Sequence, residues 1–166
     1  MKHNLNKIIS QCQNDLNNKG YTISKFDISP NVKNLVITSD YIEIDRYIKT
    51  EITQKGKLFK LMRNFCKVKK IEFIISLRES KNEWEEDGIW HDDGSRILAF
   101  SLSLTLEPPE GGILEIREKS KSLIHQIKTP KYGEIIIFKT GHENFEHKIN
   151  KVTKGKRLIV AGWCYN

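Results

Sequence analysis

Long apolar runs, paired cysteines and clusters of glycine or proline are all missing from this sequence. No stretch reaches the roughly 18 consecutive apolar residues that a membrane-spanning helix needs. The opening residues, MKHNLNKIIS, contain no apolar core of signal-peptide length. Only 10 glycines and 4 prolines occur among 166 residues, which excludes collagen-like and low-complexity chains. These absences predict an ordered globular protein without a membrane partner, located in the cytoplasm.

Cysteine is also scarce. Cys12, Cys66 and Cys164 are odd in number and far apart, and no CxxC pair occurs. A disulfide framework and a cysteine-based zinc site are therefore both disfavoured. This cysteine usage fits a reducing compartment.

Positive charge is in surplus, with 28 Lys and Arg against 21 Asp and Glu, which gives a net charge of +7. Such a surplus can indicate a nucleic-acid partner. The basic residues are spread through segments such as KGKLFK, KVKK, REKSKS and KVTKGKR instead of following one helical stripe. We therefore expect a solvated lysine-rich surface, and nucleic acid is not the expected partner.

The chain is expected to form one domain, residues 1–166, because it has no repeat, linker or low-complexity tract. Residues 1–70 read as a mainly helical support region, and residues 71–166 as a β-rich core. Apolar residues at spacings of three and four predict a first helix that stops at Gly20 and another helix over 57–67. Residues 21–26 and 34–39 look like short strands, whereas 40–52 fits either a helix or a strand.

The second part of the chain has the texture of strands. Its apolar segments are rich in β-branched and aromatic residues, and turn signals such as DDGS, EPPEGG and TPKYG separate them. Closely spaced strands with such turns favour a β-sandwich or barrel, against which the helices would pack. The predicted strands are IEFIISL, RILAFSLSLTL, GILEIRE, SLIHQIK, GEIIIFK, FEHKI and RLIVAGWCY.

The segment GIWHDDGSR carries the first candidate metal ligands. His91 and Asp93 are two residues apart, so on an extended chain they point to the same side while Asp92 points away. An imidazole and a carboxylate side by side supply two ligands of a metal site. The third must come from a distant strand, where His147 is the leading candidate and His142, in an expected turn, is its rival. His3 and His125 are the other histidines; His125 is expected to be an ordinary strand residue.

Arg157 follows His147 by ten residues. The alternation of RLIVAGW places Arg157, Ile159, Ala161 and Trp163 on one face of the last strand. An arginine on an otherwise apolar face is better suited to bind a ligand than to meet solvent. Trp163 is expected to belong to the core.

The sequence combines an HxD pair, a distal histidine, a basic residue ten positions later and a tryptophan at the end of the last strand. In this combination it resembles the iron(II)- and 2-oxoglutarate-dependent oxygenases, most closely their prolyl-hydroxylase-type branch. The segments RILAFSLSL, EGGILEI and PKYGEIIIF match the family's strand and turn pattern between these residues. The resemblance covers about residues 71–166. It implies an α+β fold in which a double-stranded β-helix, a jelly-roll or cupin-like barrel, carries N-terminal helices packed on one face.

The resemblance also implies the site. His91, Asp93 and His147 would hold Fe(II), a two-histidine, one-carboxylate set that leaves positions open for 2-oxoglutarate and O2. Arg157 would bind the far carboxylate of 2-oxoglutarate in a two-point geometry. Ascorbate is a further expected stimulant.

Some positions depart from the family pattern. Ser103 stands where the family often has a tyrosine that contacts 2-oxoglutarate, and Ala161 stands where it often has a threonine. Ser103 and Thr105 are the remaining candidates for that contact. Trp84, Trp90 and Arg78 are candidates for the substrate pocket. Residues 79–90, ahead of the motif, could form a lid.

The implied activity is that of an oxidoreductase, a dioxygenase that hydroxylates a prolyl or other amino-acid residue of a protein or peptide and yields succinate and CO2. A hydroxylase of a free amino acid or another small molecule is the alternative. A nucleic-acid demethylase of the alkylated-DNA-repair type is disfavoured, because its second arginine would fall at Trp163. A cupin-like metal enzyme that does not use 2-oxoglutarate, or a non-catalytic binding barrel, would lack a use for Arg157.

Overall fold

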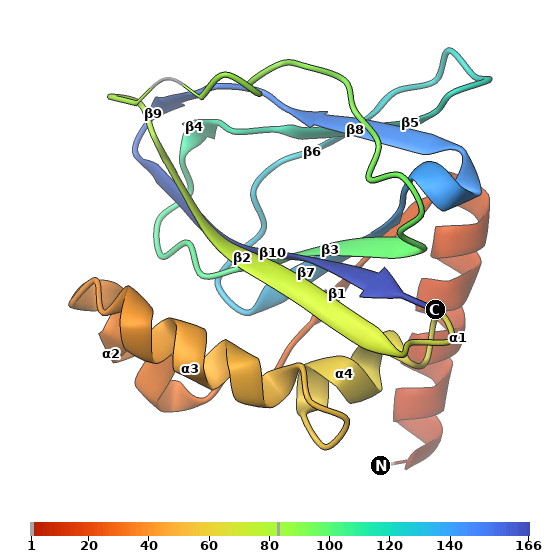
Figure 1. Ribbon diagram of the computed structural model, residues 1–166, viewed down its shortest axis with the longest axis horizontal. Coiled ribbons are helices and arrows are strands. Elements are labelled where there is room, and N and C mark those ends of the chain that lie inside the picture. Colours follow the sequence, from red (N-terminus) through yellow and green to blue (C-terminus); the bar gives the residue numbers. More distant parts are fainter. Residues whose placement is uncertain (1, 83) are drawn as a thin grey trace.

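The computed structural model describes residues 2–82 and 84–166, with side chains from residue 6 onward. Helices come first and strands dominate the remainder (Figure 1). In chain order the elements are α1 (Lys2–Lys19), β1 (Tyr21–Lys25), α2 (Pro30–Ile37), α3 (Tyr41–Glu51), α4 (Lys57–Met62), β2 (Lys70–Glu79), β3 (Leu98–Ser103), β4 (Glu110–Gly111), β5 (Leu114–Glu118), β6 (His125–Ile127), β7 (Glu134–Lys139), the 3-10 turn η1 (Gly141–Glu143), β8 (Phe145–Ile149), β9 (Val152–Lys154) and β10 (Lys156–Tyr165).

Two antiparallel sheets face each other. The larger has the order β1-β7-β3-β10-β2, and the smaller has the order β6-β5-β8. A two-stranded ribbon, β4-β9, lies at one end of this sandwich (Figure 1). The predicted fold class, α+β with a double-stranded β-helix and N-terminal helices packed on one face, is confirmed, although the two sheets do not close into a barrel.

The helices cover the outer face of the larger sheet. In Figure 1, α2, α3 and α4 lie beneath that sheet, while α1 runs along its end beside β1. Asp40 caps α3 by accepting a hydrogen bond from the backbone N–H of Glu43 at 3.1 Å. Ile44 and Ile48, one helical turn apart, are fully buried. The larger sheet therefore has one face for the helices and one face free for a site.

One strand prediction in the N-terminal part is wrong. Residues 34–39 were expected to be extended, but most of them lie in α2. Pro30 stands in the first turn of this helix, where a missing N–H costs nothing. Val32 is buried, and Val36, four residues later, packs partly against the same core. The apolar residues of this segment therefore fit the spacing of a helix.

The other predicted elements follow the sequence closely. Residues 40–52, left open between helix and strand, contain α3, and the helix predicted over 57–67 is shortened to α4. The expected strand at 21–26 is β1, which joins the larger sheet at its edge beside β7. Each strand predicted after residue 70 is present. Among the described residues, no helix is both long enough and apolar enough to cross a membrane.

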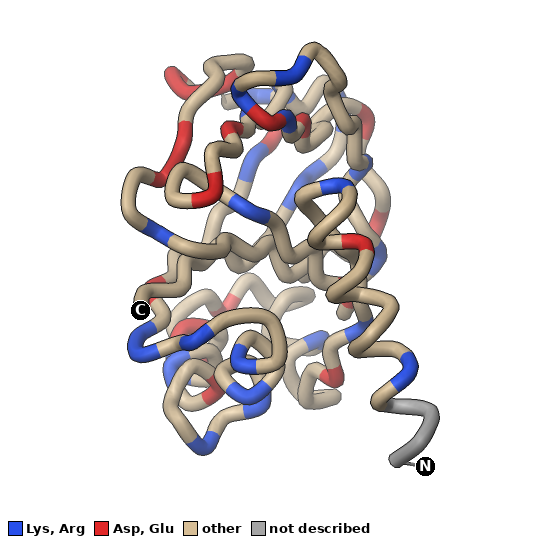
Figure 2. Tube along the Cα trace, turned by 90° about the vertical axis from the view of Figure 1, so that its right-hand side faces the viewer, with Lys and Arg blue, Asp and Glu red and all other residues tan. Residues whose placement is uncertain are grey.

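Charged residues are distributed over the whole molecule. Figure 2 shows lysine and arginine on the helical layer and on both sheets, interspersed with acidic residues. Many of the charges are paired at the surface, as in Lys57–Asp27 and Lys156–Glu79. The surplus of +7 is therefore not gathered on a single face.

Candidate metal centre

Three side chains converge between the two sheets. The ligand atoms of His91, Asp93 and His147 all lie within 4.8 Å of one another. The HxD segment is extended only at His91, which forms an isolated antiparallel bridge with His147 on β8, with N···O distances of 3.0 and 2.8 Å. This bridge brings two residues that are far apart in the sequence side by side, and their ring centroids are 4.4 Å apart.

Thr140 fixes the carboxylate of the group. Its hydroxyl donates to Oδ2 of Asp93 at 2.9 Å and accepts from the Asp93 backbone N–H at 3.0 Å. Asp92 lies outside the group and has different partners. Its Oδ1 accepts from the N–H of Gly94 at 2.8 Å, and its Oδ2 is ion-paired with Lys119. The two neighbouring aspartates thus face opposite ways.

The histidines are in states suited to binding a metal. Burial lowers the pKa of His147 to about 4, against the opposing pull of Asp93, so the ring is neutral near pH 7. Its Nδ1 is buried with no hydrogen-bond partner among the described residues. Nδ1 of His91 is 3.1 Å from the carbonyl oxygen of Ile89 and donates to it, which leaves Nε2 free as a ligand atom.

These donors fit a ferrous ion. Two imidazole nitrogens and one carboxylate oxygen on one side form the facial set that leaves coordination positions open. A bound metal would satisfy the unpartnered nitrogen of His147. Thr140 orients Asp93 in the manner expected of a residue behind a metal ligand.

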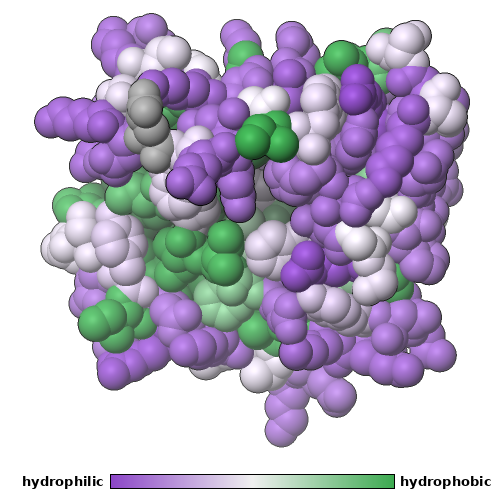
Figure 3. All heavy atoms as spheres, turned by 45° about the horizontal axis from the view of Figure 1, so that its top comes forward, coloured by the Kyte–Doolittle hydropathy of each residue, from purple (hydrophilic) through white to green (hydrophobic). Residues whose placement is uncertain are grey.

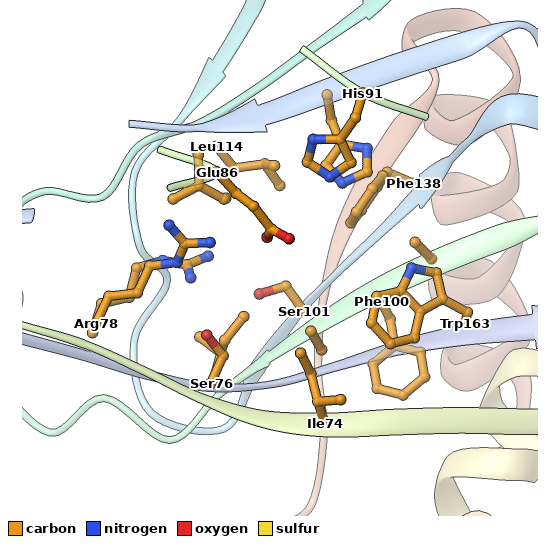
Figure 4. A pocket seen from close by; sticks show the side chains of 16 residues that line it. Ile74, Ser76, Arg78, Glu86, His91, Phe100, Ser101, Leu114, Phe138 and Trp163 are labelled. Carbon is orange, nitrogen blue, oxygen red and sulfur yellow. The ribbon is translucent and has the colours of Figure 1, made fainter. Parts of the chain in front are cut away.

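A cavity of about 100 Å³ adjoins the group. Figure 4 shows His91 on one side of it and Arg78 on the other, and His147 and Arg157 also line it. Ser76, Glu86 and Ser101 add polar groups to its wall. The apolar part of the wall comes from both sheets and includes Leu114, Phe138, Ile149, Ile159, Ala161 and Trp163.

The cavity reaches the surface. Ile74 lines it and is 51% exposed. In Figure 3, hydrophobic side chains gather in and around a hollow on a face that is otherwise mostly hydrophilic. The site therefore has an apolar mouth through which another molecule can approach the metal ligands.

Arg157 lines the cavity and forms no ion pair among the described residues. The side chain is almost fully buried, and its Nε and Nη1 have no hydrogen-bond partner within the described part of the chain. Burial, together with the nearby charge of Arg78, lowers the pKa of Arg157 to about 9, so it remains a cation at neutral pH. A buried unpaired cation is costly, and a carboxylate ligand would remove that cost.

Ser103 and Thr105 are not in the lining of the cavity. The Ser103 hydroxyl donates to the carbonyl of Pro130 at 2.8 Å. The Thr105 hydroxyl donates to the carbonyl of Leu158 at 2.9 Å and accepts from its N–H at 3.0 Å. Their contact with 2-oxoglutarate stays a prediction, and it would require these backbone bonds to be exchanged.

The three residues expected in the substrate pocket do not all lie at the cavity. Arg78 lines the cavity, and the ring of Trp84 lies 5.0 Å from its guanidinium carbon. Trp90 is not among the lining residues. Its ring centroid lies 4.1 Å from Cζ of Arg117 and 5.0 Å from Nζ of Lys148, both on the smaller sheet.

The other histidines do not join the centre. His142 lies in the exposed turn η1, and His125 begins β6 and contacts Tyr21. The side chain of His3 lies outside the described residues.

Five polar residues of the site lie outside the candidates predicted from the sequence: Ser76, Glu86, Asp87, Ser101 and Thr140. Ser101 could have been found, because it lies two residues before Ser103 on the same face of β3. Thr140, Glu86 and Asp87 carry no local pattern that marks them, since their roles depend on contacts with distant segments.

Comparison with known proteins gives a consistent result. The family model described as the 2OG-Fe(II) oxygenase superfamily matches residues 69–165. No curated protein matches the chain.

Solved structures with the same fold include a prolyl-4-hydroxylase from Pseudomonas putida, with a TM-score of 0.62 and 16% identity, covering 95% of this chain and 91% of that one. A prolyl hydroxylase from Trichoplax adhaerens, in complex with a hypoxia inducible factor peptide fragment, has a TM-score of 0.65 at 11% identity over 96% and 89%. The non-heme epimerase SnoN from nogalamycin biosynthesis has a TM-score of 0.63 at 10% identity over 96% and 83%. At these identities the likeness concerns the fold.

Proposed function

Because the chain belongs to the 2OG-Fe(II) oxygenase superfamily, whose members use Fe(II), 2-oxoglutarate and O2, we propose that it hydroxylates a prolyl or other amino-acid residue of a protein or peptide. Succinate and CO2 would be the coproducts. The observation that carries this proposal is the meeting of the His91, Asp93 and His147 group with the unpaired Arg157 in one cavity.

Each residue has a task in this reaction. His91, Asp93 and His147 would hold the iron, which when bound supplies the oxidation of 2-oxoglutarate and of the substrate by O2. Thr140 keeps the Asp93 carboxylate turned toward the metal. Arg157 would hold the far carboxylate of 2-oxoglutarate and so fix its reacting end near the histidines. The apolar wall, with Leu114 and Phe138, keeps bulk water out.

The apolar mouth of the cavity supports a peptide substrate, because one side chain can enter there while the rest of the peptide stays outside. Two neighbours by fold are prolyl hydroxylases, one of them in complex with a peptide fragment.

A free amino acid or another small molecule is the second candidate. The observation that favours it is the fold shared with an epimerase from nogalamycin biosynthesis. A metal enzyme that does not use 2-oxoglutarate would leave Arg157 as an unexplained buried charge.

A substrate screen tests the proposal. The protein is incubated with Fe(II), 2-oxoglutarate, ascorbate and either proline-containing peptides or free amino acids, and succinate and the product mass are measured. We expect succinate formation stimulated by peptides, with a gain of one oxygen atom in the peptide. Asp93→Ala is the inactive control. Stimulation by free amino acids alone would favour the second candidate, and equal succinate formation by Asp93→Ala would contradict the metal assignment.

A further inference from the structure

We propose that Arg78 is a second binding residue for the far carboxylate of 2-oxoglutarate, which it shares with Arg157 after exchanging its ion pair with Asp87. This inference rests on the proposed use of 2-oxoglutarate. It concerns a residue on β2, well before the HxD pair in the chain.

The strand register places the two arginines together. Arg78 on β2 is directly opposite Arg157 on β10 in the antiparallel ladder. Both side chains are buried, with exposures of 7% and 1%, and both line the same cavity. In Figure 4 the guanidinium of Arg78 extends into the cavity on the side opposite His91.

Two like charges opposite each other on a sheet repel, and burial increases the cost. A bound anion between the two guanidiniums removes that cost. A carboxylate has two oxygens, and each can accept a charge-assisted hydrogen bond from a different arginine.

Asp87 neutralises only part of this charge. It is ion-paired with Nη1 of Arg78 and lies in a tight turn, in which its N–H donates to the carbonyl of Trp84 at 3.0 Å. Nε of Arg78 and both Nε and Nη1 of Arg157 have no hydrogen-bond partner among the described residues. Glu86 also lines the cavity and favours the charged form of Arg78, but it forms no ion pair with either arginine among the described residues, so donors remain for a ligand carboxylate.

The hydroxyls expected from the sequence are not free for this task. Ser103 and Thr105 are bonded to backbone groups, and Ala161 has no hydroxyl. Arg78 is the charged donor on the strand that adjoins Arg157. The stack of Trp84 on Arg78 fixes the guanidinium in place and couples it to the segment that carries Asp87.

The experiment compares Arg78→Gln with Asp87→Asn. Dissociation constants for 2-oxoglutarate are measured by calorimetry on protein loaded with Mn(II) in place of Fe(II), so that no turnover occurs. Arg78→Gln should weaken binding about tenfold or more, because a charge-assisted hydrogen bond is lost. Asp87→Asn should bind 2-oxoglutarate at least as tightly as the wild type, because the competing carboxylate is gone.

A purely structural role for Arg78 gives a different pattern. If Arg78 served only to hold Asp87, both variants would break the same ion pair and would weaken binding equally, which would overturn the proposal. Unchanged binding by Arg78→Gln would overturn it as well and would leave Arg78 to the substrate. Circular dichroism melts check that both variants are folded, and Arg46→Gln, on the exposed face of α3, is the control for loss of one arginine charge.

A second ligand, which lacks the far carboxylate, tests whether Arg78 acts on that group. 2-Oxopentanoate keeps the oxoacid end of 2-oxoglutarate but has a methyl group in place of the far carboxylate. Its affinity should be the same for the wild type and Arg78→Gln; an equal loss for both ligands would contradict the assignment.

Arg157→Met separates this inference from the proposed function. If Arg157→Met binds 2-oxoglutarate like the wild type, the use of 2-oxoglutarate itself fails, whereas a defect in Arg157→Met but not in Arg78→Gln removes Arg78 alone.

Discussion

At the scale of single residues, neighbours in the sequence have unlike roles. Asp92 and Asp93 are adjacent, but only Asp93 lies with the histidines, and only Asp93 is held by Thr140. Asp92 pairs with Lys119 at the surface. The alternation of an extended chain predicts this difference, and the hydrogen bonds give its physical cause.

The two aspartates should respond differently to substitution. Asp93→Ala is expected to lose Fe(II) binding, because a carboxylate ligand is removed, while Asp92→Ala retains it and loses the ion pair with Lys119 and the hydrogen bond from Gly94. Calorimetric titration with Mn(II) or Fe(II) under argon measures both. Equal metal affinities in the two variants would contradict the assignment.

Arg157 is a residue whose function opposes stability. Its buried charge has no ion-pair partner among the residues that the structure describes, and the proposed ligand carboxylate would supply one. Arg157→Met, which fills similar space without charge, should raise the free energy of unfolding of the ligand-free protein by about 1–3 kcal/mol. It should also abolish the stabilisation that 2-oxoglutarate gives the wild type by binding to the folded state. Urea denaturation with and without 2-oxoglutarate measures both effects; a less stable ligand-free variant would refute the prediction.

The same residue gives the stability a dependence on pH. The pKa of Arg157 is about 9 in the folded protein, well below its ordinary value, because burial disfavours the cation. Between these values the unfolded chain binds more protons, so stability from this group rises with pH, whereas below about pH 9 its full cost is present. The advantage of Arg157→Met over the wild type should therefore be largest below about pH 9 and shrink toward about pH 10.5. An advantage that grew in this range would have the wrong sign.

At the scale of elements, the site depends on contacts between segments that are distant in the sequence. The HxD segment is held by the bridge to β8 and by Thr140, which follows β7 directly. Thr140→Val keeps the shape of the side chain but removes both hydrogen bonds to Asp93. Metal affinity should fall about 10- to 100-fold, as for other residues behind a metal ligand. Thr38→Val, at the exposed end of α2, is the matched control and should leave metal affinity unchanged.

The turn between β4 and β5 makes room for Arg157. Gly112 has a φ of +62°, and a Cβ there would lie 2.9 Å from Cδ of Arg157. Gly112→Ala should therefore displace the arginine and weaken 2-oxoglutarate binding while metal affinity is kept. Calorimetry with each ligand measures the two effects.

Gly155→Ala is the control for Gly112→Ala. It imposes similar backbone strain at a φ of +79°, but its Cβ would meet only ordinary contacts with Pro109. Equal losses of 2-oxoglutarate affinity in both variants would mean that backbone strain, and not contact with Arg157, is the cause.

At the scale of the whole molecule, helices support one face of the larger sheet and the site occupies the other. Leu98 and Leu102 belong to the core that includes the helices, whereas Ala99 and Ser101 line the cavity, as does Phe100. Every residue of β3 is consequently buried. The smaller sheet lies above the larger one in Figure 1, and residues of both sheets line the cavity between them.

Much of this architecture could be predicted from local patterns. Alternation along the last strand identifies the face shared by Arg157, Ile159, Ala161 and Trp163, and all four line the cavity. Spacing alone makes His91 and Asp93 neighbours in space. The prediction of a strand at 34–39 was wrong because a short apolar run fits the spacing of a strand as well as that of a helix. Here a proline in the first turn favours the helix.

What could not be predicted depends on register between distant strands. Arg78 meets Arg157 because β2 and β10 pair at one particular offset, and nothing near Arg78 in the sequence encodes that offset. Asp87 and Thr140 likewise act across turns that are closed by contacts elsewhere. Contacts of this kind become visible only when the sheets are assembled.

The central claim is that one cavity binds Fe(II) through His91, Asp93 and His147 and binds 2-oxoglutarate through Arg157. Its most direct test is an anaerobic titration of the protein with Fe(II) and 2-oxoglutarate, followed by visible absorption. The account predicts a weak charge-transfer band that needs both ligands and disappears in Asp93→Ala. In Arg157→Met the band should require a much higher concentration of 2-oxoglutarate. A wild-type protein that shows no band, or an Asp93→Ala variant that shows the same band, would contradict the claim.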